Sequence, residues 1–238
     1  MLKRLPAGLT LALIVLALAH GPVAQLPDYH AFADQSHWLG LPHAGDLLSN
    51  LGFVLLGVWG GRVAWPQAGT PGASGQRLFI VALFATGWGS AFYHWAPDDF
   101  RLIWDRLPIA LACAGLLAAV RASCLVRESL LWTVGLASFA IAGVGGWVVS
   151  GDLRAYLLLQ VLPLLLIPLW QAGARRPRRE RLAFALALAV YVLAKLAELG
   201  DHALAAQLAP LTGHTLKHLL AALAAALILN EWRQQRRG

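Results

Sequence analysis

The chain has few charged residues and only two cysteines, and each scarcity excludes a class of protein. Charged side chains make up 13% of its 238 residues, far below the share expected in a soluble domain. Cys113 and Cys124 lack the spacing of a metal clip or of an extracellular disulfide framework, so we assign both a structural role. The sequence also shows no internal repeat and no low-complexity segment. A soluble globular domain and a disulfide-stabilised secreted domain are therefore excluded.

Long hydrophobic runs take up most of the chain, and 58% of its residues are hydrophobic. Their Leu and Ala content favours helices, whereas the alternating pattern of a membrane β-barrel is missing. Windows of about 20 residues match the thickness of a bilayer. They predict an all-α integral membrane protein, a helical bundle whose candidate spans lie near 6–24, 46–65, 78–96, 102–120, 129–149, 153–171, 181–199 and 211–229.

The first span has two interpretations. Lys3 and Arg4, a short apolar core and Ala17-Leu18-Ala19 fit a secretory signal with a small-residue cleavage site, but they also fit a retained helix. We favour a seven-transmembrane bundle with an extra N-terminal helix. The predicted segments are an extra helix or signal segment at 1–24, an external loop at 25–45, a seven-helix catalytic domain at 46–229 and a basic cytoplasmic tail at 230–238.

Positive charge alternates from loop to loop, which predicts the orientation of the chain. By the positive-inside rule, the loops rich in Lys and Arg lie in the cytoplasm with both termini, and the acidic loops lie outside. A short cytoplasmic loop also explains the run from Arg175 to Arg181 without a nucleic-acid partner. The Ala and Arg content suggests a bacterial source, and hence the inner membrane with a periplasmic outer face. The cytoplasmic set is Lys3, Arg4, Arg62, Arg77, Arg121, Arg127, Arg175, Arg176, Arg178, Arg179, Arg181, Arg233, Arg236 and Arg237, and the external set is Asp28, Asp34, Asp98, Asp99, Asp152 and Asp201.

Polar residues inside the spans gather near the external ends. Ser90 and His94 close the third span, Asp105 opens the fourth, and His214 and His218 open the last. Ser90 and His94 stand one helical turn apart, as do His214 and His218, so each pair shares a helix face. Two helices can therefore present three imidazoles at one depth.

Three neutral histidines with an open position are the ligand set of a catalytic zinc ion, which lowers the pKa of its bound water to about 7. In this interpretation Asp105 holds or deprotonates the water, and Ser90 hydrogen-bonds to the water or to an oxyanion. A lone interfacial histidine is more often a surface or hydrogen-bonded side chain, and an HxxxH pair alone is a weak signal. Together the three histidines, Ser90 and Asp105 favour a metal site. Ionisable side chains inside a membrane cost free energy, so they usually serve a function.

Three patches of the sequence resemble the alkaline ceramidases and the wider CREST superfamily of membrane hydrolases. They are DLLSNLGFVLLG at 46–57, GSAFYHWAPDDFRLIWDRLP at 89–108 and GHTLKHLLAALAAALI at 213–228. The resemblance extends over roughly 46–229, with its identities concentrated in these patches. It implies seven transmembrane helices around a zinc ion held by three histidines, as in the related adiponectin-receptor-like proteins.

The resemblance also implies roles for particular residues. The zinc ligands would be His94, His214 and His218, the catalytic pair Ser90 and Asp105, and the supporting Ser-Asn of the first core helix Ser49 and Asn50. The implied activity is cleavage of the amide bond of ceramide or a related N-acyl lipid to a fatty acid and an amine, by attack of zinc-bound hydroxide on the carbonyl. An ester substrate stays open because the same chemistry serves both bonds, and bacteria often lack ceramide.

The eukaryotic members of this family bear a calcium site, formed by an acidic stretch and a Glu-x-x-Asn before the Ser-Asn. Here that register holds His43 and Asp46, and residues 29–34 offer too few carboxylates for the roughly six to eight oxygens that calcium takes. We therefore leave calcium out. Asp34, His30 and Asp46 have two interpretations, as a structural lid over the external mouth or as solvated loop residues.

A further polar group closes the seventh span. The spacing allows Lys195 to pair with Glu198, and Glu198 to pair with His202, and we favour a structural ion pair. In the alternative, Glu198 or Asp201 attracts the amine of a sphingoid-like headgroup at the outer mouth. We expect Lys217 on a different helix face from the histidines, with its ammonium snorkelling to the interface.

A non-hydrolytic receptor or a small-solute transporter is the alternative from another class. A transporter should show repeats or paired broken helices near the bilayer midplane, whereas these polar residues lie toward one face. A receptor built on the same zinc fold stays open. The sequence indicates no oligomeric state, acyl-chain length or headgroup.

Overall fold

The structure is a computed structural model that describes residues 4–236, and it is mostly helical. The described residues form two compact units. The first comprises 4–26, 65–80 and 109–184, and the second 27–64, 81–108 and 185–236. The elements are α1 (Leu5–His20), β1 (His37–Trp38), β2 (Leu41–Pro42), α2 (Ala44–Ser49), α3 (Leu51–Val63), α4 (Ala73–Trp95), α5 (Asp99–Leu125), α6 (Leu130–Ser150), α7 (Arg154–Gly173), α8 (Arg178–Leu199), α9 (Asp201–Leu208) and α10 (Gly213–Gln235).

Within the described residues, four helices are long and apolar enough to cross a membrane, namely α5, α6, α7 and α8. The helices α9 and α10 meet the same criteria as a pair, with a bend of 101° between them. The chain is therefore a helical membrane protein, and its residues 4–236 contain four such helices, or five if the bent pair is one span. The helix α1 is apolar but only 16 residues long.

The observed helices differ from the predicted spans in two ways. The span predicted near 46–65 is interrupted, since α2 ends at Ser49 and α3 begins at Leu51 and has only 13 residues. Although α4 and α10 have 23 residues each, neither qualifies alone among the described residues. Polar side chains such as His94 on α4 and Lys217 on α10 lower their hydropathy. The two helices that carry the histidines, α4 and α10, are thus less apolar than α5 to α8 and less suited to being surrounded by lipid.

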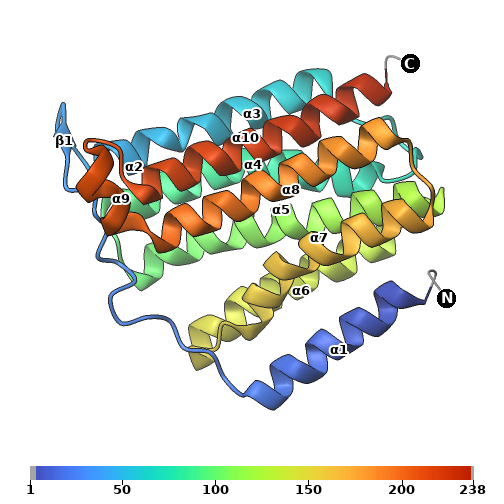
Figure 1. Ribbon diagram of the computed structural model, residues 1–238, viewed down its shortest axis with the longest axis horizontal. Helices are drawn as coiled ribbons and strands as arrows, with labels where there is room; N and C mark the ends of the chain where they lie inside the picture. The colour runs from blue at the N-terminus through green and yellow to red at the C-terminus, as the bar shows by residue number, and fades with distance from the viewer. Residues whose placement is uncertain (1–3, 237–238) are drawn as a thin grey trace. The chain divides into compact units, whose positions relative to one another are not determined.

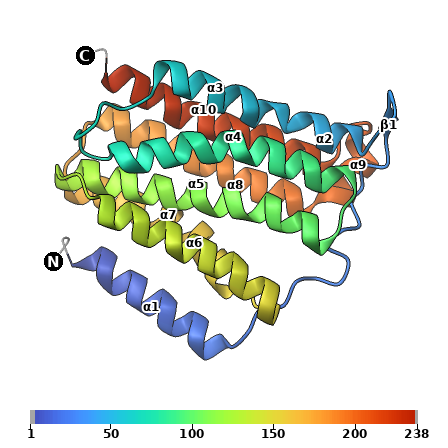
Figure 2. The ribbon, with the colours of Figure 1, turned by 180° about the vertical axis from the view of Figure 1, so that it is seen from behind.

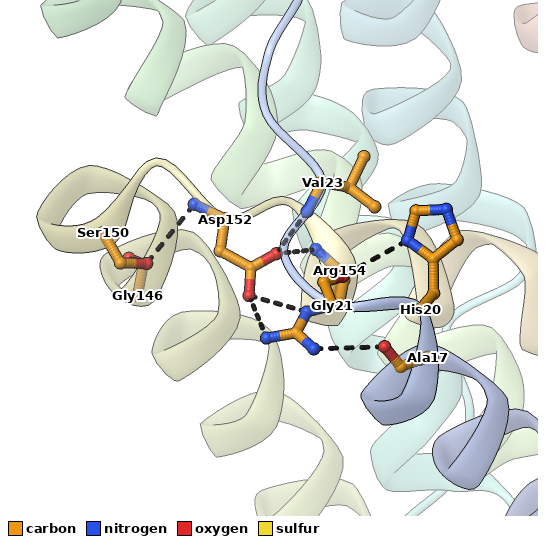
Figure 3. Close-up of polar contacts among 8 residues, drawn as sticks. All are labelled: Ala17, His20, Gly21, Val23, Gly146, Ser150, Asp152 and Arg154. Atoms are coloured by element: carbon orange, nitrogen blue, oxygen red, sulfur yellow. Dashed lines mark hydrogen bonds and ion pairs between the residues drawn. The ribbon is translucent and has the colours of Figure 1, made fainter.

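In the first unit, α1 and α6 both pack on α7, and both ribbon views show these helices together (Figure 1, Figure 2). The connection between α6 and α7 also holds the end of α1. Arg154 donates from Nη1 to the carbonyl oxygen of Ala17 at 3.1 Å and from Nε to Asp152 Oδ2 at 2.8 Å. The main-chain N–H of Val23 donates to Asp152 Oδ1 at 3.1 Å, so one ion pair fixes both the helix and the chain that follows it (Figure 3).

In the second unit, α10 packs against α2, α3 and α9, and α3 runs alongside it in both views (Figure 1, Figure 2). Two glycines allow close helix contacts. A Cβ atom at Gly89 on α4 would lie 1.9 Å from the carbonyl oxygen of Trp104 on α5. A Cβ atom at Gly213 on α10 would lie 2.3 Å from the carbonyl oxygen of Ala197 on α8. These contacts bring together the ends of α4, α5, α8 and α10, where the polar residues lie.

Candidate metal centre

Three histidines meet at one point in the second unit. His94, His214 and His218 each offer a ring nitrogen, and these nitrogens lie within 4.8 Å of one another. The ring centroids are 4.8 to 5.0 Å apart, and the side chains are buried. Helical spacing puts His214 and His218 on one face of α10, and the end of α4 brings His94 to them. The structure therefore unites the three histidines that the sequence singled out.

The position of the proton on His218 follows from its contacts. Its Nδ1 lies 3.1 Å from the main-chain carbonyl oxygen of Asp46 and 2.8 Å from Ser49 Oγ. Because a carbonyl oxygen can only accept, Nδ1 carries the proton and Nε2 presents its lone pair. His218 Nε2 is buried and has no hydrogen-bond partner among residues 4–236. Fixing one ring nitrogen through a main-chain carbonyl is the usual way in which proteins orient a metal-ligating histidine.

Ser49 and Asn50 support the same carbonyl. Ser49 Oγ donates to the main-chain oxygen of Asp46 at 3.0 Å, and Asn50 Nδ2 donates to it at 2.8 Å. Asn50 is fully buried. The two residues named as supporting from the sequence therefore lie behind a histidine rather than in contact with the point where the three rings meet.

His94 has two buried nitrogens without partners. Neither Nδ1 nor Nε2 meets a hydrogen-bond partner in the described part of the chain, although the side chain is 0% exposed. A buried polar group left unsatisfied costs about 1–3 kcal/mol. A metal ion shared with His214 and His218 would satisfy one of these nitrogens, and three imidazoles suit a transition metal. The residues present therefore fit a metal ion.

His214 is held through its main chain. Its N–H donates to Asp201 Oδ1 at 2.8 Å, and the N–H of Ala33 donates to Asp201 Oδ2 at 2.9 Å. Asp201 therefore connects the start of α10 to the loop that precedes α2. Since both of its oxygens accept from the main chain, the carboxylate positions a candidate ligand.

Ser90 and Asp105 are buried in the same unit, with exposed fractions of 1% and 4%. The close contact of α4 and α5 at Gly89 lies next to Ser90, whose Oγ has no hydrogen-bond partner among residues 4–236. Ser90 stands one turn before His94 on α4, and Asp105 is within electrostatic reach of Lys217. A hydroxyl group and a carboxylate placed beside a metal can donate to an oxyanion and accept a proton.

Residues 29–34, which we call the covering segment, lie against the histidines. The ring centroid of Phe32 is 4.7 Å from that of His94 and 4.5 Å from that of His214. Phe32 is itself buried. An apolar ring in this position excludes water from the point where the histidines meet.

Side-chain contacts fix the covering segment to α4 and α5. His30 Nδ1 lies 2.8 Å from the hydroxyl oxygen of Tyr93, and His30 Nε2 lies 3.2 Å from Asp99 Oδ1. Tyr93 also contacts Phe32, with 5.7 Å between the ring centroids. The segment therefore has specific partners on both helices.

Asp34 and Asp46 are buried, so their interpretation as solvated loop residues is wrong. Asp34 Oδ2 accepts from the N–H of Asp46, and Oδ1 accepts from the N–H of Ser36, each at 2.9 Å. Burial acts to raise the pKa of Asp34, but these hydrogen bonds and nearby His43 outweigh it, so the pKa lies below its ordinary value. The ionised Asp34 carboxylate ties the covering segment to the start of α2.

Lys217 turns toward the histidines, and the prediction that it snorkels from another face is wrong. Its Nζ lies 3.2 Å from His214 Nε2 and 2.7 Å from Glu198 Oε1. A carboxylate on the neighbouring helix α8 makes this inward position favourable. Glu198 also pairs with Lys195, as the spacing predicts. His202, expected to pair with Glu198, instead contacts a carbonyl oxygen of the covering segment at 2.9 Å.

Several residues of the site were not predicted from the sequence. Thr212 and Thr215 donate their hydroxyl hydrogens to Asp46 Oδ1, at 3.2 and 2.6 Å. Thr212 also caps α10, and a Thr before a helix start is a readable signal. Phe32 gave no such signal, because it lies in a loop, where no periodic pattern indicates which residues a side chain contacts.

Comparisons with known proteins do not extend this description. The chain matches no family model, no curated protein and no solved structure. Any function for the site must therefore be argued from its own residues and their geometry.

Proposed function

We propose that the protein is a zinc-dependent hydrolase that cleaves an acyl bond of a lipid within the membrane. The observation that carries this proposal is the meeting of three buried imidazoles, whose nitrogens include atoms of His94 and His218 that have no hydrogen-bond partner among residues 4–236. Asp105 and Ser90 add a buried carboxylate and a buried hydroxyl. Three histidines with an open fourth position are typical of catalytic zinc.

In this proposal His94, His214 and His218 hold a zinc ion, which polarises a carbonyl group and lowers the pKa of water. Asp105 orients the attacking water and accepts its proton on a carboxylate oxygen. Ser90 donates its hydroxyl hydrogen to the oxyanion that forms as the water oxygen bonds to the carbonyl carbon. The bond from that carbon to the leaving nitrogen then breaks. The proton held by Asp105 passes to the nitrogen, so that a fatty acid and an amine are released.

The proposed bond is the amide of ceramide or of a related N-acyl lipid. This choice rests on the sequence resemblance to the alkaline ceramidases at 89–108 and 213–228. An ester is the alternative bond, since the same residues would serve it. The ring of Phe32 covers the histidines, so it must move aside when an acyl group enters.

The decisive experiment measures zinc content and fatty-acid release on the same purified samples. Native protein and its His94→Ala and His214→Ala variants are assayed with N-acyl and O-acyl lipids of one chain length. We expect about one zinc per chain in the native protein, and loss of zinc and of fatty-acid release in both variants. His37→Ala, which changes an exposed histidine of β1, is the matched control. Zinc binding without release from any lipid would favour a non-hydrolytic receptor, and absence of zinc would overturn the proposal.

We further propose a seven-span bundle in the bacterial inner membrane. In it, α2 with α3 forms one broken span, α4 to α8 form five spans, and α9 with α10 forms the seventh. The histidines and Asp105 lie at helix ends that connect to acidic loops, whereas the basic loops lie at the opposite ends. The positive-inside rule then puts the metal centre on the periplasmic face and the C-terminus in the cytoplasm. Cysteine labelling from each side of the membrane tests this orientation.

We propose that the N-terminal segment that contains α1 is retained as an extra helix rather than cleaved as a signal. The supporting observation is that Arg154 contacts the main chain of Ala17 and Asp152 that of Val23, on both sides of the potential cleavage site (Figure 3). The N–H of Leu153 also donates to the carbonyl oxygen of Val23 at 2.8 Å. Intact-mass measurement of membrane-extracted protein checks this. A mass that lacks about 20 N-terminal residues would show a cleaved signal instead.

A further inference from the structure

Two lysines share one carboxylate beside the candidate metal centre. Glu198 pairs with Lys195 through Oε2, and its Oε1 lies 2.7 Å from Lys217 Nζ. We call these three residues the lysine cluster. One carboxylate balances only one of two ammonium groups, so the cluster carries a net positive charge. Because both oxygens of Glu198 are engaged, the cluster is poorly suited to the amine of a substrate.

Lys217 is the member of the cluster that reaches the histidines. Its Nζ lies 3.2 Å from His214 Nε2, and its side chain is 13% exposed, against 40% for Lys195. Asp105 also acts on it electrostatically, and its carboxylate offsets part of the positive charge until it takes the proton of the attacking water. An ammonium group has three donors. Glu198 takes one, and His214 takes none once its single lone pair binds the metal, so donors remain for a further acceptor.

We propose that Lys217 binds an anionic group of the substrate, and that the substrate class is the N-acyl amino acids. This inference rests on the proposed hydrolase function and deepens it. Because Nζ is so close to a candidate zinc ligand, an anion bound there must lie within a few bonds of the carbonyl carbon that is attacked. In an N-acyl amino acid, the carboxylate is separated from the scissile amide nitrogen by a single carbon. A charge-assisted hydrogen bond is among the stronger contacts available in a buried site.

The charge of the group beyond the amide distinguishes the N-acyl amino acids from lipids that carry a neutral hydroxyl or an amine there. The neutral hydroxyl of a ceramide-like lipid would accept from Lys217 but would not balance its charge. A free amine on the substrate would be repelled by the lysine cluster. Hydrolysis of the anionic substrate needs no additional reactant, because water supplies the oxygen of the fatty acid and the proton of the released amino acid.

The test uses three dodecanoyl amides that differ only in the group beyond the amide. These are N-dodecanoylglycine, N-dodecanoylethanolamine and N-dodecanoylethylenediamine, which end in a carboxylate, a hydroxyl and an ammonium. The zinc-loaded protein is assayed for kcat/KM with each. We expect the carboxylate to be favoured about tenfold over the hydroxyl, as befits one hydrogen bond between charged groups, with the ammonium poorest. Equal rates, or preference for the hydroxyl or the ammonium, would overturn the inference.

Two variants connect the preference to the residue. Lys217→Met removes the ammonium, leaves Lys195 to balance Glu198, and should reduce the tenfold preference to about one, mainly through KM for N-dodecanoylglycine. Lys195→Met is the comparison variant: it removes the net charge of the cluster but keeps the ammonium beside His214, so it should reduce the preference less than Lys217→Met does. Zinc content and thermal unfolding are measured for both, so that a folding defect is recognised. A preference that survives in Lys217→Met would refute the role of Lys217.

Binding distinguishes failure of this inference from failure of the hydrolase proposal. If no amide or ester is cleaved, the hydrolase proposal fails, and calorimetric binding of N-dodecanoylglycine to the zinc-loaded protein becomes the readout. Binding that is about tenfold weaker in Lys217→Met but not in Lys195→Met would uphold the anion site alone. Equal affinity in the native protein and in Lys217→Met would overturn it.

Discussion

The main-chain carbonyl oxygen of Asp46 lies 3.1 Å from Nδ1 of His218, and this contact decides which ring nitrogen faces the other two histidines. A carbonyl group cannot donate, so His218 must carry its proton on Nδ1. The two residues come from α2 and α10, which pack together in the second unit. The main-chain oxygen of Asp46 on α2 therefore orients the His218 ring on α10 so that its Nε2 lone pair is available to a metal ion.

Ser49→Ala should weaken zinc binding without abolishing it. The variant removes the hydroxyl oxygen that lies 2.8 Å from His218 Nδ1 and keeps the contact with Asp46. Loss of a group that orients a ligand typically lowers metal affinity about tenfold or more. Competition with a chromogenic chelator measures the affinity. Ser150→Ala, which removes a hydroxyl from an exposed position on α6, should bind zinc as tightly as the native protein, and equal affinity of the two variants would contradict the prediction.

Phe32→Ala should both destabilise the protein and expose the metal. The ring is buried against His94, His214 and Tyr93. Truncating a buried Phe costs about 3 kcal/mol or more in the free energy of unfolding. The rate at which EDTA removes zinc should also rise, because water can reach the histidines. Phe100→Ala, at a position 63% exposed, is the control, and a rate of removal no faster than in this control would show that Phe32 does not cover the site.

Gly89→Ala should separate α4 from α5. The added Cβ would lie 1.9 Å from the carbonyl oxygen of Trp104, a main-chain atom that cannot rotate away. We expect a loss of about 3 kcal/mol in the free energy of unfolding and a lower zinc content, since Ser90 and His94 follow on the same helix. The Cβ added by Gly145→Ala on α6 would meet no atom of residues 4–236 within 4 Å, so this variant should be neutral or stabilising by up to about 1 kcal/mol. Chemical denaturation of both variants in one detergent compares them, and similar midpoints would rule out the close contact.

Asp152→Asn should flatten the acid dependence of stability in the first unit. The hydrogen bond from Arg154 lowers the pKa of Asp152 to about 2, from an ordinary value of 3.8. A carboxyl group whose pKa is lowered on folding stabilises the fold above its unfolded pKa, and this contribution disappears as the pH falls through the folded pKa. The native protein should therefore lose stability from about pH 4 down to pH 2, and Asp152→Asn should be less stable at neutral pH but change less over that window.

Thermal unfolding between pH 2 and pH 7 measures this difference. The exposed loop residue Asp28 provides the control as Asp28→Asn, which should follow the native profile. An unaltered pH profile in Asp152→Asn would show that the contacts with Arg154 and Val23 do not stabilise the fold.

Parts of the site could be predicted because helix geometry is local. The turn that separates Ser90 from His94, and His214 from His218, places each pair on one face whatever the rest of the chain does. Charge alone could not place Lys217. Its direction depends on Glu198, which lies on a different helix and pairs with it at 2.7 Å. The break between α2 and α3 was also missed, because the apolar pattern continues through Asn50 and its side chain caps no helix by hydrogen bonding.

The composition and spacing of the sequence were sufficient to determine a helical membrane protein with three histidines on two helices. The physical reason is that a bilayer requires each helix to satisfy its own main-chain hydrogen bonds, and that helical periodicity acts over a few residues. Only the tertiary structure decided which ring nitrogens are left for a metal, that Phe32 covers them and that Lys217 faces them. Those features depend on contacts between residues far apart in the sequence, such as Asp46 with His218 and Glu198 with Lys217. Such contacts are decided by how the helices pack, which no local pattern contains.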